Sequence, residues 1–413
     1  MAAKKNDEFK AIYDLGEAMR EFIVSTTIEI AKVRTVNYNP ADHPGQGPDG
    51  MDMPGHESRV VDILEPILDQ WNVPHYREGR LPERPSLFAS VGRCRPGERR
   101  MMFLLHTDTV PTGSPDDWKF PPFEAHEKNG KLFGRGVLDN KGPMVASLAA
   151  LKILKDHEDR IPGEVIFAAL ADEEVQAGYG LDWLLENDKV RCDEAIVPDI
   201  AGDMKEINIA EKGRVQLRII AHGKAAHAMD PSRGVSAIYG VSEVIGKLEK
   251  MKMPHTKHPI LGSPTHNIGI VRGGSATNAV PDHAEVTVDI RYVPGQKESK
   301  IKKQISDICK AVAKKRKGLR FKIEMERGAL PIMVKPGAPI VEVILRHAPM
   351  AKIVGTGGGT FAHPLVERGI NAVGWSPGNE RTYHQPNEEI AVSQLTRYAG
   401  RLAAVVLDRM NES

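Results

Sequence analysis

The chain has 413 residues, and its 56 Lys and Arg residues nearly balance its 55 Asp and Glu residues. This balance leaves no strong field that would recruit nucleic acid or an anionic membrane, so we expect neither as a partner. The polar start, residues 1–10, lacks the apolar core of a signal peptide, and no later run approaches the roughly 20 apolar residues of a membrane helix. We therefore expect a cytoplasmic protein.

The three cysteines, Cys94, Cys192 and Cys309, are widely spaced and odd in number. Such a set does not suggest a disulfide framework, and it fits a reducing compartment. The length exceeds what one hydrophobic core normally serves, which predicts two domains.

The first half of the chain alternates helical and strand patterns. Apolar residues recur at helical spacing over 17–32 and 56–71. Further along, the pattern predicts strands at 86–91 and 100–105 and helices at 143–155 and 181–187, and apolar runs lie at 164–171 and 195–197. This alternation is typical of an α/β domain with a doubly wound sheet, which we expect to be mixed.

The pattern changes near residue 212. The next elements are predicted in the order strand, helix, strand, strand, helix, strand, at 215–221, 235–251, 267–272, 284–292, 298–316 and 320–326. This order is that of a ferredoxin-like module. The helix at 298–316 is rich in Lys, but no aromatic residues interleave it, so we interpret it as a solvated face and not as a nucleic-acid site.

The last part returns to a mixed α/β pattern, with segments at 340–348 and 371–375 and a helix from Val392. The module is therefore predicted to be an insertion. The expected organisation is a catalytic domain in two parts, 1–211 and 329–413, that flank an inserted domain at 212–328.

Acids and histidines follow several of the apolar runs. Imidazole nitrogen and carboxylate oxygen suit zinc, cobalt and manganese, whereas a site for soft ions would recruit thiolates. None of the cysteines lies in these motifs. The residues are His106 and Asp108 in LLHTDTVP, Asp139 in GRGVLDNKG, Glu173 and Glu174 in ADEEV, Asp199 in IVPD, and His384 in TYHQPNE.

Two of these motifs predict how the ligands are held. Asp108 follows His106 by two residues, so in an extended chain it lies on the same side and can accept the second imidazole N–H. Asp139 lies in a Gly-rich turn, where its two carboxylate oxygens can bridge two cations.

The adjacent acids Glu173 and Glu174 predict a division of labour. On an extended segment their side chains face opposite ways, so one can bind metal while the other reaches the water. A metal lowers the pKa of bound water to about 7, and a free carboxylate can then take the proton. We assign Glu173 as the base and Glu174 as the ligand. Asp199 supplies a terminal carboxylate, with Asp203 as the alternative.

The motif order H-x-D, G-R-G-x-x-D-x-K-G, E-E, D and a distant C-terminal His resembles one metallopeptidase family. It is the family of acetylornithine deacetylase, succinyl-diaminopimelate desuccinylase, aminoacylase and glutamate carboxypeptidase. The resemblance extends from about Phe22 to the end of the chain. It implies that two zinc-like ions, bridged by Asp139, are bound by His106, Asp139, Glu174, Asp199 and His384.

The resemblance also gives the inserted domain a role. In this family the insertion is a lid that commonly forms the dimer contact, so we expect a homodimer. His227, in GKAAHAMDP, is expected to stabilise the oxyanion, from the other subunit in dimeric relatives, and His222 is a weaker candidate. By the same resemblance Asn278 helps to hold substrate, and Arg291 pairs with a substrate carboxylate or forms a structural ion pair.

The Gly-rich run from Gly355 to Thr360 can present backbone N–H groups to an anion. It lies where this family binds the substrate carboxylate, so we take Gly358 and Thr360 as candidate substrate contacts. Tyr383 and His363 depart from the family pattern, because relatives commonly have small residues there or, near His363, an acid. A tyrosine beside the metal would reshape the leaving-group pocket, so Tyr383 is a further candidate.

These features predict a hydrolase that cleaves the amide C–N bond of a small carboxylate-bearing substrate, such as an N-acyl amino acid or a dipeptide. It would use one or two divalent ions per subunit, with zinc favoured and manganese or cobalt as alternatives. One alternative is hydrolytic deamination of an aryl-amine or ureido compound. Another is a metal-binding module without turnover, against which the intact Glu173 argues.

Overall fold

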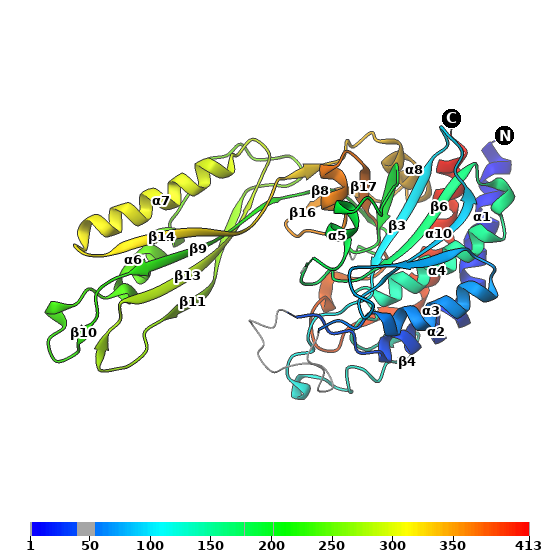
Figure 1. Cartoon of the computed structure of the whole chain (residues 1–413). Coiled ribbons are helices and arrows are strands. Elements are labelled where there is room, and N and C mark those ends of the chain that lie inside the picture. The colour runs from blue at the N-terminus through cyan, green and yellow to red at the C-terminus, as the bar shows by residue number, and fades with distance from the viewer. Residues whose placement is uncertain (1, 39–53, 177, 201, 413) are drawn as a thin grey trace. The chain divides into compact units, whose positions relative to one another are not determined.

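The computed structural model describes residues 2–38, 54–176, 178–200 and 202–412, which fall into two compact units (Figure 1). The first unit comprises described residues within 1–209, 334–354 and 360–413, and the second those within 210–333 and 355–359. No helix among the described residues is long and apolar enough to cross a membrane.

A large mixed sheet forms the centre of the first unit, except that β15 and the ends of β8 and β16 are assigned to the second unit. Its order is β1-β2-β6-β3-β7-β17-β8-β15, and β16 pairs with β8. The central strands β6, β3, β7 and β17 are parallel, whereas the pairs β1/β2, β2/β6, β17/β8 and β8/β15 are antiparallel. The bounds are β1 His75–Glu78, β2 Ser86–Arg93, β3 Arg100–His106, β6 Gly163–Leu170, β7 Glu194–Val197, β8 Glu206–Glu211, β15 Ile332–Met333, β16 Lys352–Thr356 and β17 Asn371–Gly374.

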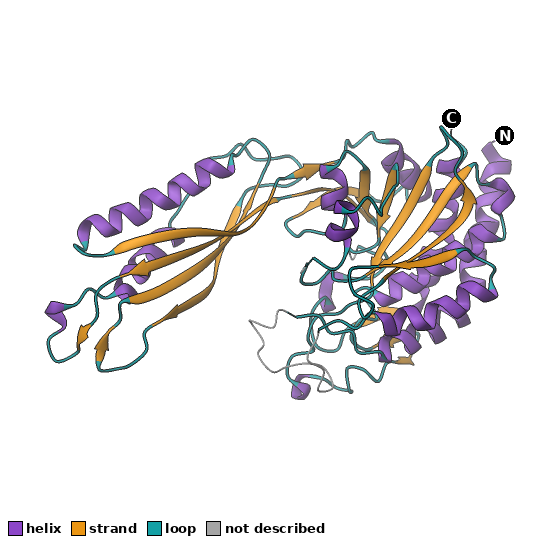
Figure 2. Cartoon of the chain, in the orientation of Figure 1, coloured by secondary structure: helices purple, strands orange, loops and turns teal. Residues whose placement is uncertain are grey.

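Helices cover both faces of this sheet, as Figure 2 shows. On one face, Leu184 of α5 and Leu365 of α9 pack in an apolar cluster with Leu104 of β3. The neighbouring residue Phe103 points to the opposite face of the sheet and is also buried. On that face α4 packs against β3 and β6. The bounds are α1 Ala2–Ala18, α2 Arg20–Lys32, α3 Ser58–Gln70, α4 Lys141–Lys155, α5 Leu181–Glu186, α8 Pro339–His347, α9 Ala362–Glu367 and α10 Val392–Met410. The predicted mixed α/β class is confirmed.

Two predicted helices differ at their ends. The helix expected over 17–32 is divided, because α1 ends at Ala18 and α2 begins at Arg20. In α1, a Cβ atom on Gly16 would lie 2.5 Å from the backbone nitrogen of Gly400, so the glycine allows α1 to pack closely on α10. The helix expected from Pro143 begins at Lys141, since a proline is tolerated in the first turn.

The second unit is built on a four-stranded antiparallel sheet of order β11-β13-β9-β14. Its elements follow as strand, helix, strand, strand, helix, strand. Leu217 of β9, Val244 of α6 and Ile305 of α7 share one apolar core. The bounds are β9 Gly213–His222, α6 Ala237–Glu249, β11 Thr265–Gly273, β13 His283–Tyr292, α7 Glu298–Lys315 and β14 Arg320–Ala329, with β10 Ala226–His227 paired to β12 Ala279–Val280.

A small three-stranded sheet of order β18-β5-β4 completes the first unit. It joins β4 His126–Lys128 and β5 Lys131–Phe133 to β18 Glu389–Ala391, which is distant in sequence. This sheet brings the C-terminal segment beside the Gly-rich turn that follows β5. Short 3-10 helices lie at Pro115–Asp117, Glu158–Arg160, Pro231–Arg233 and Glu380–Thr382.

Candidate metal centre

The carboxyl ends of three parallel strands bring the predicted ligands together. Strand β3 lies between β6 and β7 in the sheet. His106 is the last residue of β3, Glu174 follows β6 in a short turn, and Asp199 follows β7 by two residues. Because parallel strands end at the same edge of a sheet, side chains from distant parts of the sequence meet there.

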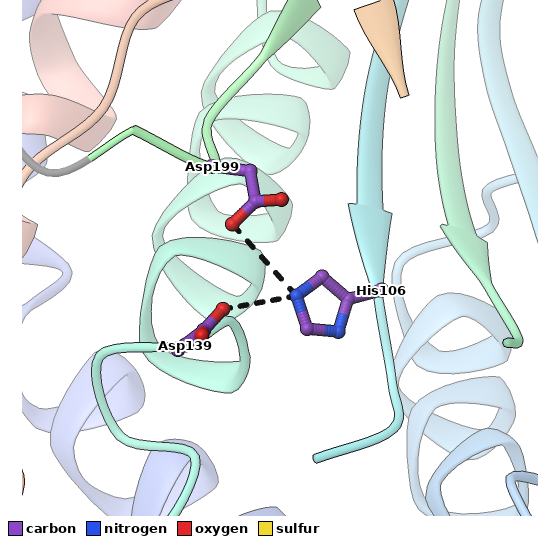
Figure 3. Close-up of side chains that lie close together, drawn as sticks. All are labelled: His106, Asp139 and Asp199. Carbon is purple, nitrogen blue, oxygen red and sulfur yellow. Dashed lines mark hydrogen bonds and ion pairs between the residues drawn. The ribbon is translucent and has the colours of Figure 1, made fainter. Parts of the chain in front are cut away.

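One group of side chains surrounds the Nε2 atom of His106. This nitrogen lies 3.0 Å from Oδ1 of Asp139 and 3.8 Å from Oδ1 of Asp199, and the two carboxylates point toward it from different elements (Figure 3). The imidazole is 1% exposed. One nitrogen and two oxygens at these spacings form a set that can hold a divalent ion.

A second group shares Asp139 with the first. The other oxygen of that carboxylate, Oδ2, lies 2.9 Å from Nε2 of His384, and Oε2 of Glu174 lies 3.3 Å from the same nitrogen. His384 adopts a left-handed backbone conformation, with φ 56°. Asp139 therefore presents one oxygen to each imidazole, which is the geometry expected of a carboxylate between two cations.

Asp108 connects His106 to the turn that follows β6. Its Oδ1 lies 3.3 Å from Nδ1 of His106 and accepts the N–H of Glu173 at 3.2 Å. Its Oδ2 accepts the N–H of Glu174 at 3.1 Å and the side-chain amide of Asn37 at 2.8 Å. The Nδ1 atom of His106 also bonds the backbone carbonyl of Asp108, at 3.0 Å, so Asp108 orients the imidazole with its backbone as well as its carboxylate. The carboxylate also fixes the backbone of the acidic pair. Asn37 was missed from the sequence, because an isolated polar residue after a helix carries no local signal.

The acidic pair is not extended. Residues 173–175 form a turn, and Asp172 before them has a left-handed φ of 62°. We expected Glu173 and Glu174 to lie on an extended segment and to point apart for that reason. The extended segment is wrong, because both residues lie in the turn. The structure separates them through the turn instead: Glu174 contacts His384, whereas Glu173 lies outside both metal-binding groups of the described residues.

The pKa shifts of the cluster follow from the burial of several acids close together. Burial, reinforced by Asp199, raises the pKa of Glu173 well above its ordinary value. Burial and the neighbouring Asp139 raise the pKa of Glu174 to about 7. Hydrogen bonds to Asp139 and Glu174 raise the pKa of His384 to about 10. The carboxylates are packed more densely than the two histidines can neutralise.

The residues fit one or two divalent ions. Oε1 of Glu174 is buried and has no hydrogen-bond partner among the described residues. A buried carboxylate oxygen in that state is costly unless a cation or an ordered water compensates it. Together with the oxygen and nitrogen donors already aimed at one another, this atom supports a cation site, for which His106, Asp139, Asp199, Glu174 and His384 supply the donor set.

The rival acid Asp203 lies apart from the cluster. It has a left-handed φ of 48°, and its carboxylate pairs with Lys205 at 3.0 Å and with Arg397 at 3.5 Å. Of the two candidates, Asp199 is the one that approaches His106.

Tyr383 precedes His384, and the two rings lie 6.3 Å apart. Its hydroxyl is buried and has no hydrogen-bond partner within the described part of the chain. Burial, with Asp199 and Asp139 nearby, raises the pKa of this phenol well above its ordinary value. The side chain therefore remains a neutral hydrogen-bond donor close to the acids.

The predicted lid residues all belong to the second unit. His227 is exposed, and its Nδ1 accepts the N–H of Met229 at 3.1 Å. Asn278 lies beside it, because its carbonyl accepts the N–H of Ala228 at 2.9 Å. The alternative, His222, ends β9, and its ring lies 5.7 Å from that of His283.

Arg291 is engaged within the second unit. Its Nε donates to Asp289 at 2.6 Å, and its Nη1 donates to the carbonyl of Gly357 at 2.8 Å. The N–H of Gly358 is directed at Oγ1 of Thr356 at 3.0 Å. Thr360, in the first unit, is buried, and its Oγ1 accepts the N–H of Ala362 at 3.1 Å at the start of α9.

Comparison with known proteins identifies a family for this chain. The model of peptidase family M20/M25/M40 matches residues 102–408. Succinyl-diaminopimelate desuccinylase of Paracoccus denitrificans is 29% identical over 345 residues, which cover 79% of this chain and 86% of that protein.

Solved structures share the fold. Human carnosine dipeptidase 1 superposes with a TM-score of 0.77 at 17% identity and covers 98% of this chain and 99% of its own. The Bacillus subtilis YXEP protein, described as a dinuclear metal-binding peptidase of the M20 family, superposes with a TM-score of 0.66 at 13% identity and covers 95% and 98%.

Proposed function

The chain belongs to peptidase family M20/M25/M40 and is a metal-dependent hydrolase of C–N bonds, and we propose that it cleaves small carboxylate-bearing amides such as N-acyl amino acids or dipeptides. The observation that carries this proposal is the carboxylate of Asp139 between the imidazoles of His106 and His384, at 3.0 and 2.9 Å. The names of two similar proteins, a desuccinylase and a carnosine dipeptidase, describe enzymes that act on an N-acyl amino acid and on a dipeptide, which supports this substrate class.

The proposed metal ligands divide into two sets around the shared Asp139. His106 and Asp199 complete one set, and Glu174 and His384 complete the other. Zinc is favoured by the mixture of imidazole and carboxylate, with manganese or cobalt as alternatives. When bound, divalent ions supply an acidified water and polarise the scissile carbonyl.

Glu173 is proposed as the general base. It lies beside the ligand Glu174 yet outside both ligand sets, so its carboxylate is available for proton transfer. Burial raises its pKa, which brings it closer to the value that suits a group that takes a proton from water and passes it to the leaving amine. Asp108 is proposed to support both steps, because it holds His106 and the backbone of the acidic pair.

His227 is proposed to donate a hydrogen bond to the oxyanion from the partner subunit. Its exposed position within the second unit is consistent with such a role in a dimer. Removal of one oxyanion donor typically costs about 10²–10³-fold in rate.

Substrate contacts are proposed for Asn278, Arg291, Gly358, Thr360 and Tyr383. The guanidinium of Arg291 lies beside the Gly-rich loop and bonds it at Gly357, but it also pairs with Asp289 at 2.6 Å, so a structural ion pair is the alternative to a substrate contact. The buried hydroxyl of Tyr383 is proposed to border the leaving group.

We also propose the domain division 1–211, 212–328 and 329–413, with the insertion as a ferredoxin-like lid that forms a homodimer. The two compact units support the division. For the dimer, β11 lies at the edge of its sheet and exposes Val271 at 56%, and Tyr239 of α6 is 65% exposed. An edge strand with exposed apolar side chains favours association with another chain.

Deamination of an aryl-amine or ureido compound is the second candidate, and Tyr383 is the observation that favours it. A buried phenol beside the acids differs from the small residue expected there and could border an aromatic leaving group. A metal-binding module without turnover is disfavoured by the free carboxylate of Glu173.

The test is release of amine or ammonia from a panel of N-acyl amino acids, dipeptides and amino-aromatic acids. The protein is first stripped of metal with a chelator, and separate samples are then reconstituted with zinc, manganese or cobalt. Metal-dependent release from the amides supports the proposal, and release from the amino-aromatic acids alone favours the second candidate. Metal binding with no release from any compound would contradict both.

A further inference from the structure

We infer that Glu388 is a positioning residue that, together with Arg135, builds the half of the metal centre formed by Asp139, Glu174 and His384. The inference rests on the proposed function, because it assumes that these residues bind metal. One buried carboxylate sets the geometry of this half of the centre. The half at His106 and Asp199 is held by other contacts.

The carboxylate of Glu388 is surrounded by N–H donors of the Asp139 turn. Its Oε1 accepts the backbone N–H of Leu138 at 2.8 Å and of Asp139 at 3.0 Å. Its Oε2 accepts hydrogen bonds from the backbone N–H of Gly136 at 3.1 Å and from the Nη1–H of Arg135 at 2.7 Å. The Glu388 side chain is 0% exposed. Four donors converge on two oxygens, so this one side chain determines the course of the turn that carries Asp139.

The same side chain belongs to the segment that carries His384. Arg135 strengthens the connection, because its Nη1 also donates to the carbonyl of Gln385 at 3.4 Å, next to His384. The carbonyl of Glu388 accepts the N–H of Gly134 at 3.2 Å. Both ligands that face each other at 2.9 Å, Asp139 and His384, are therefore attached to the same clamp.

The other half of the centre depends on different supports. His106 is the last residue of β3 and is oriented by Asp108 at 3.3 Å. Asp199 follows β7, and Asn140 donates to it at 3.4 Å and to the carbonyl of Pro198 at 2.6 Å. Loss of the clamp should release His384 and displace Asp139, which both halves share, while His106 and Asp199 stay in place, so the half with Glu174 and His384 should be weakened more.

Glu388→Gln is the informative substitution because it preserves shape and removes acceptors. An amide nitrogen in place of either oxygen would face two N–H donors, so two of the four hydrogen bonds would be lost. The carboxylate bonds to Arg135 and to the backbone are also charge-assisted and stronger than their neutral counterparts. The matched control is Glu389→Gln, since Glu389 is the next residue and pairs with Lys131 at 2.5 Å on the surface.

The experiment measures zinc stoichiometry and affinity by equilibrium dialysis of metal-free full-length protein, with circular dichroism of the same samples as a check of folding. We expect two zinc ions for the wild type and for Glu389→Gln. For Glu388→Gln we expect one ion bound nearly as in the wild type and a second bound about 10–100-fold more weakly, the range typical of lost support to a metal ligand. Cobalt substitution gives a second readout, because the absorption of one of the two ions should change.

Equal affinity of Glu388→Gln and the wild type for both ions would overturn the inference, as would equal weakening of both ions. A wild type that binds one ion would also overturn it, since no second half-site would exist, and a wild type that binds none would refute the proposed function itself. If Glu388→Gln does not fold, Arg135→Lys replaces it, because it keeps the charge but lacks the planar fork with which Arg135 bonds Glu388, Gln385 and Pro111. Unchanged binding of the second ion in that variant would equally overturn the inference.

Discussion

The Oδ1 atom of Asp108 lies 3.3 Å from the Nδ1 atom of His106, on the opposite side of the imidazole from Nε2, which faces Asp139. Burial opposes protonation of His106, but its hydrogen bonds to Asp108 and Asp139 raise its pKa well above the ordinary value. The ring is therefore held in one orientation, with one nitrogen bonded to Asp108 and the other directed at the acids.

This relationship predicts the effect of Asp108→Asn. The amide cannot accept the N–H groups of both Glu173 and Glu174, although the backbone carbonyl at position 108 still bonds His106. Metal affinity should therefore fall about 10–100-fold. Isothermal titration of the metal-free protein with zinc measures the change. Asp116→Asn is the control, because Asp116 is exposed in a short 3-10 helix. If both variants bind zinc like the wild type, Asp108 does not support the centre.

Glu173→Gln should separate turnover from metal binding. The amide cannot accept a proton, so the turnover number should fall at least 10²–10⁴-fold, the usual contribution of a general base. Metal content should be retained, because Glu173 lies outside both ligand sets. Steady-state kinetics and metal analysis of the same preparation check this, with Glu186→Gln on the surface of α5 as control. An active Glu173→Gln enzyme would refute the assignment of the base.

His227→Ala should lower the rate about 10²–10³-fold with little change in metal content, because His227 belongs to neither ligand set. If the histidine serves the partner subunit, mixed dimers of His227→Ala and Glu173→Gln should recover part of the activity that each variant lacks alone. Unmixed dimers are the control. No recovery in dimers shown to have exchanged subunits would mean that His227 acts in its own subunit or not at all.

Removal of metal should destabilise the protein as well as inactivate it. Ions that bind the folded chain stabilise it by mass action, by about 2.7 kcal/mol when the free ion is at 100 times its dissociation constant. The buried acids at Asp139, Glu174 and Asp199 strengthen this expectation, since their like charges are otherwise poorly compensated. Thermal unfolding after chelation, and again after zinc is restored, measures the effect. Identical melting of both forms would argue against a metal site among these acids.

Arg84→Met should destabilise the fold, although Arg84 is not one of the proposed metal ligands. Arg84 forms a buried ion pair with Glu57, at 2.6 Å, and both side chains are 0–1% exposed. Removal of one partner leaves a buried charge, which typically costs about 3–5 kcal/mol. Urea unfolding measures the loss. Arg77→Met is the control, because its pairs with Asp62 and Glu65 are partly exposed and should contribute less than about 1 kcal/mol.

The sequence by itself predicted many of the helices and strands, but not α1, β1 or β8, and it named the acids and histidines that the fold brings together. Apolar runs located β3, β6 and β7 to within a residue or two, because a buried strand must be apolar along its length. His106, Glu174 and Asp199 were recognisable since each comes shortly after such a run. The α/β class followed from the alternation of the two periods, which is a local property of the chain.

The tertiary structure decided which polar residues meet. The sequence left Asp199 and Asp203 as rivals, and packing brings Asp199 to His106 while Asp203 pairs with Lys205. The folded chain also brings Asn37 and Glu388 to the centre, and their hydrogen bonds join segments that are far apart in the sequence. Such bonds depend on the positions of two distant backbones, so they leave no periodic mark on either segment, and only the folded chain reveals them.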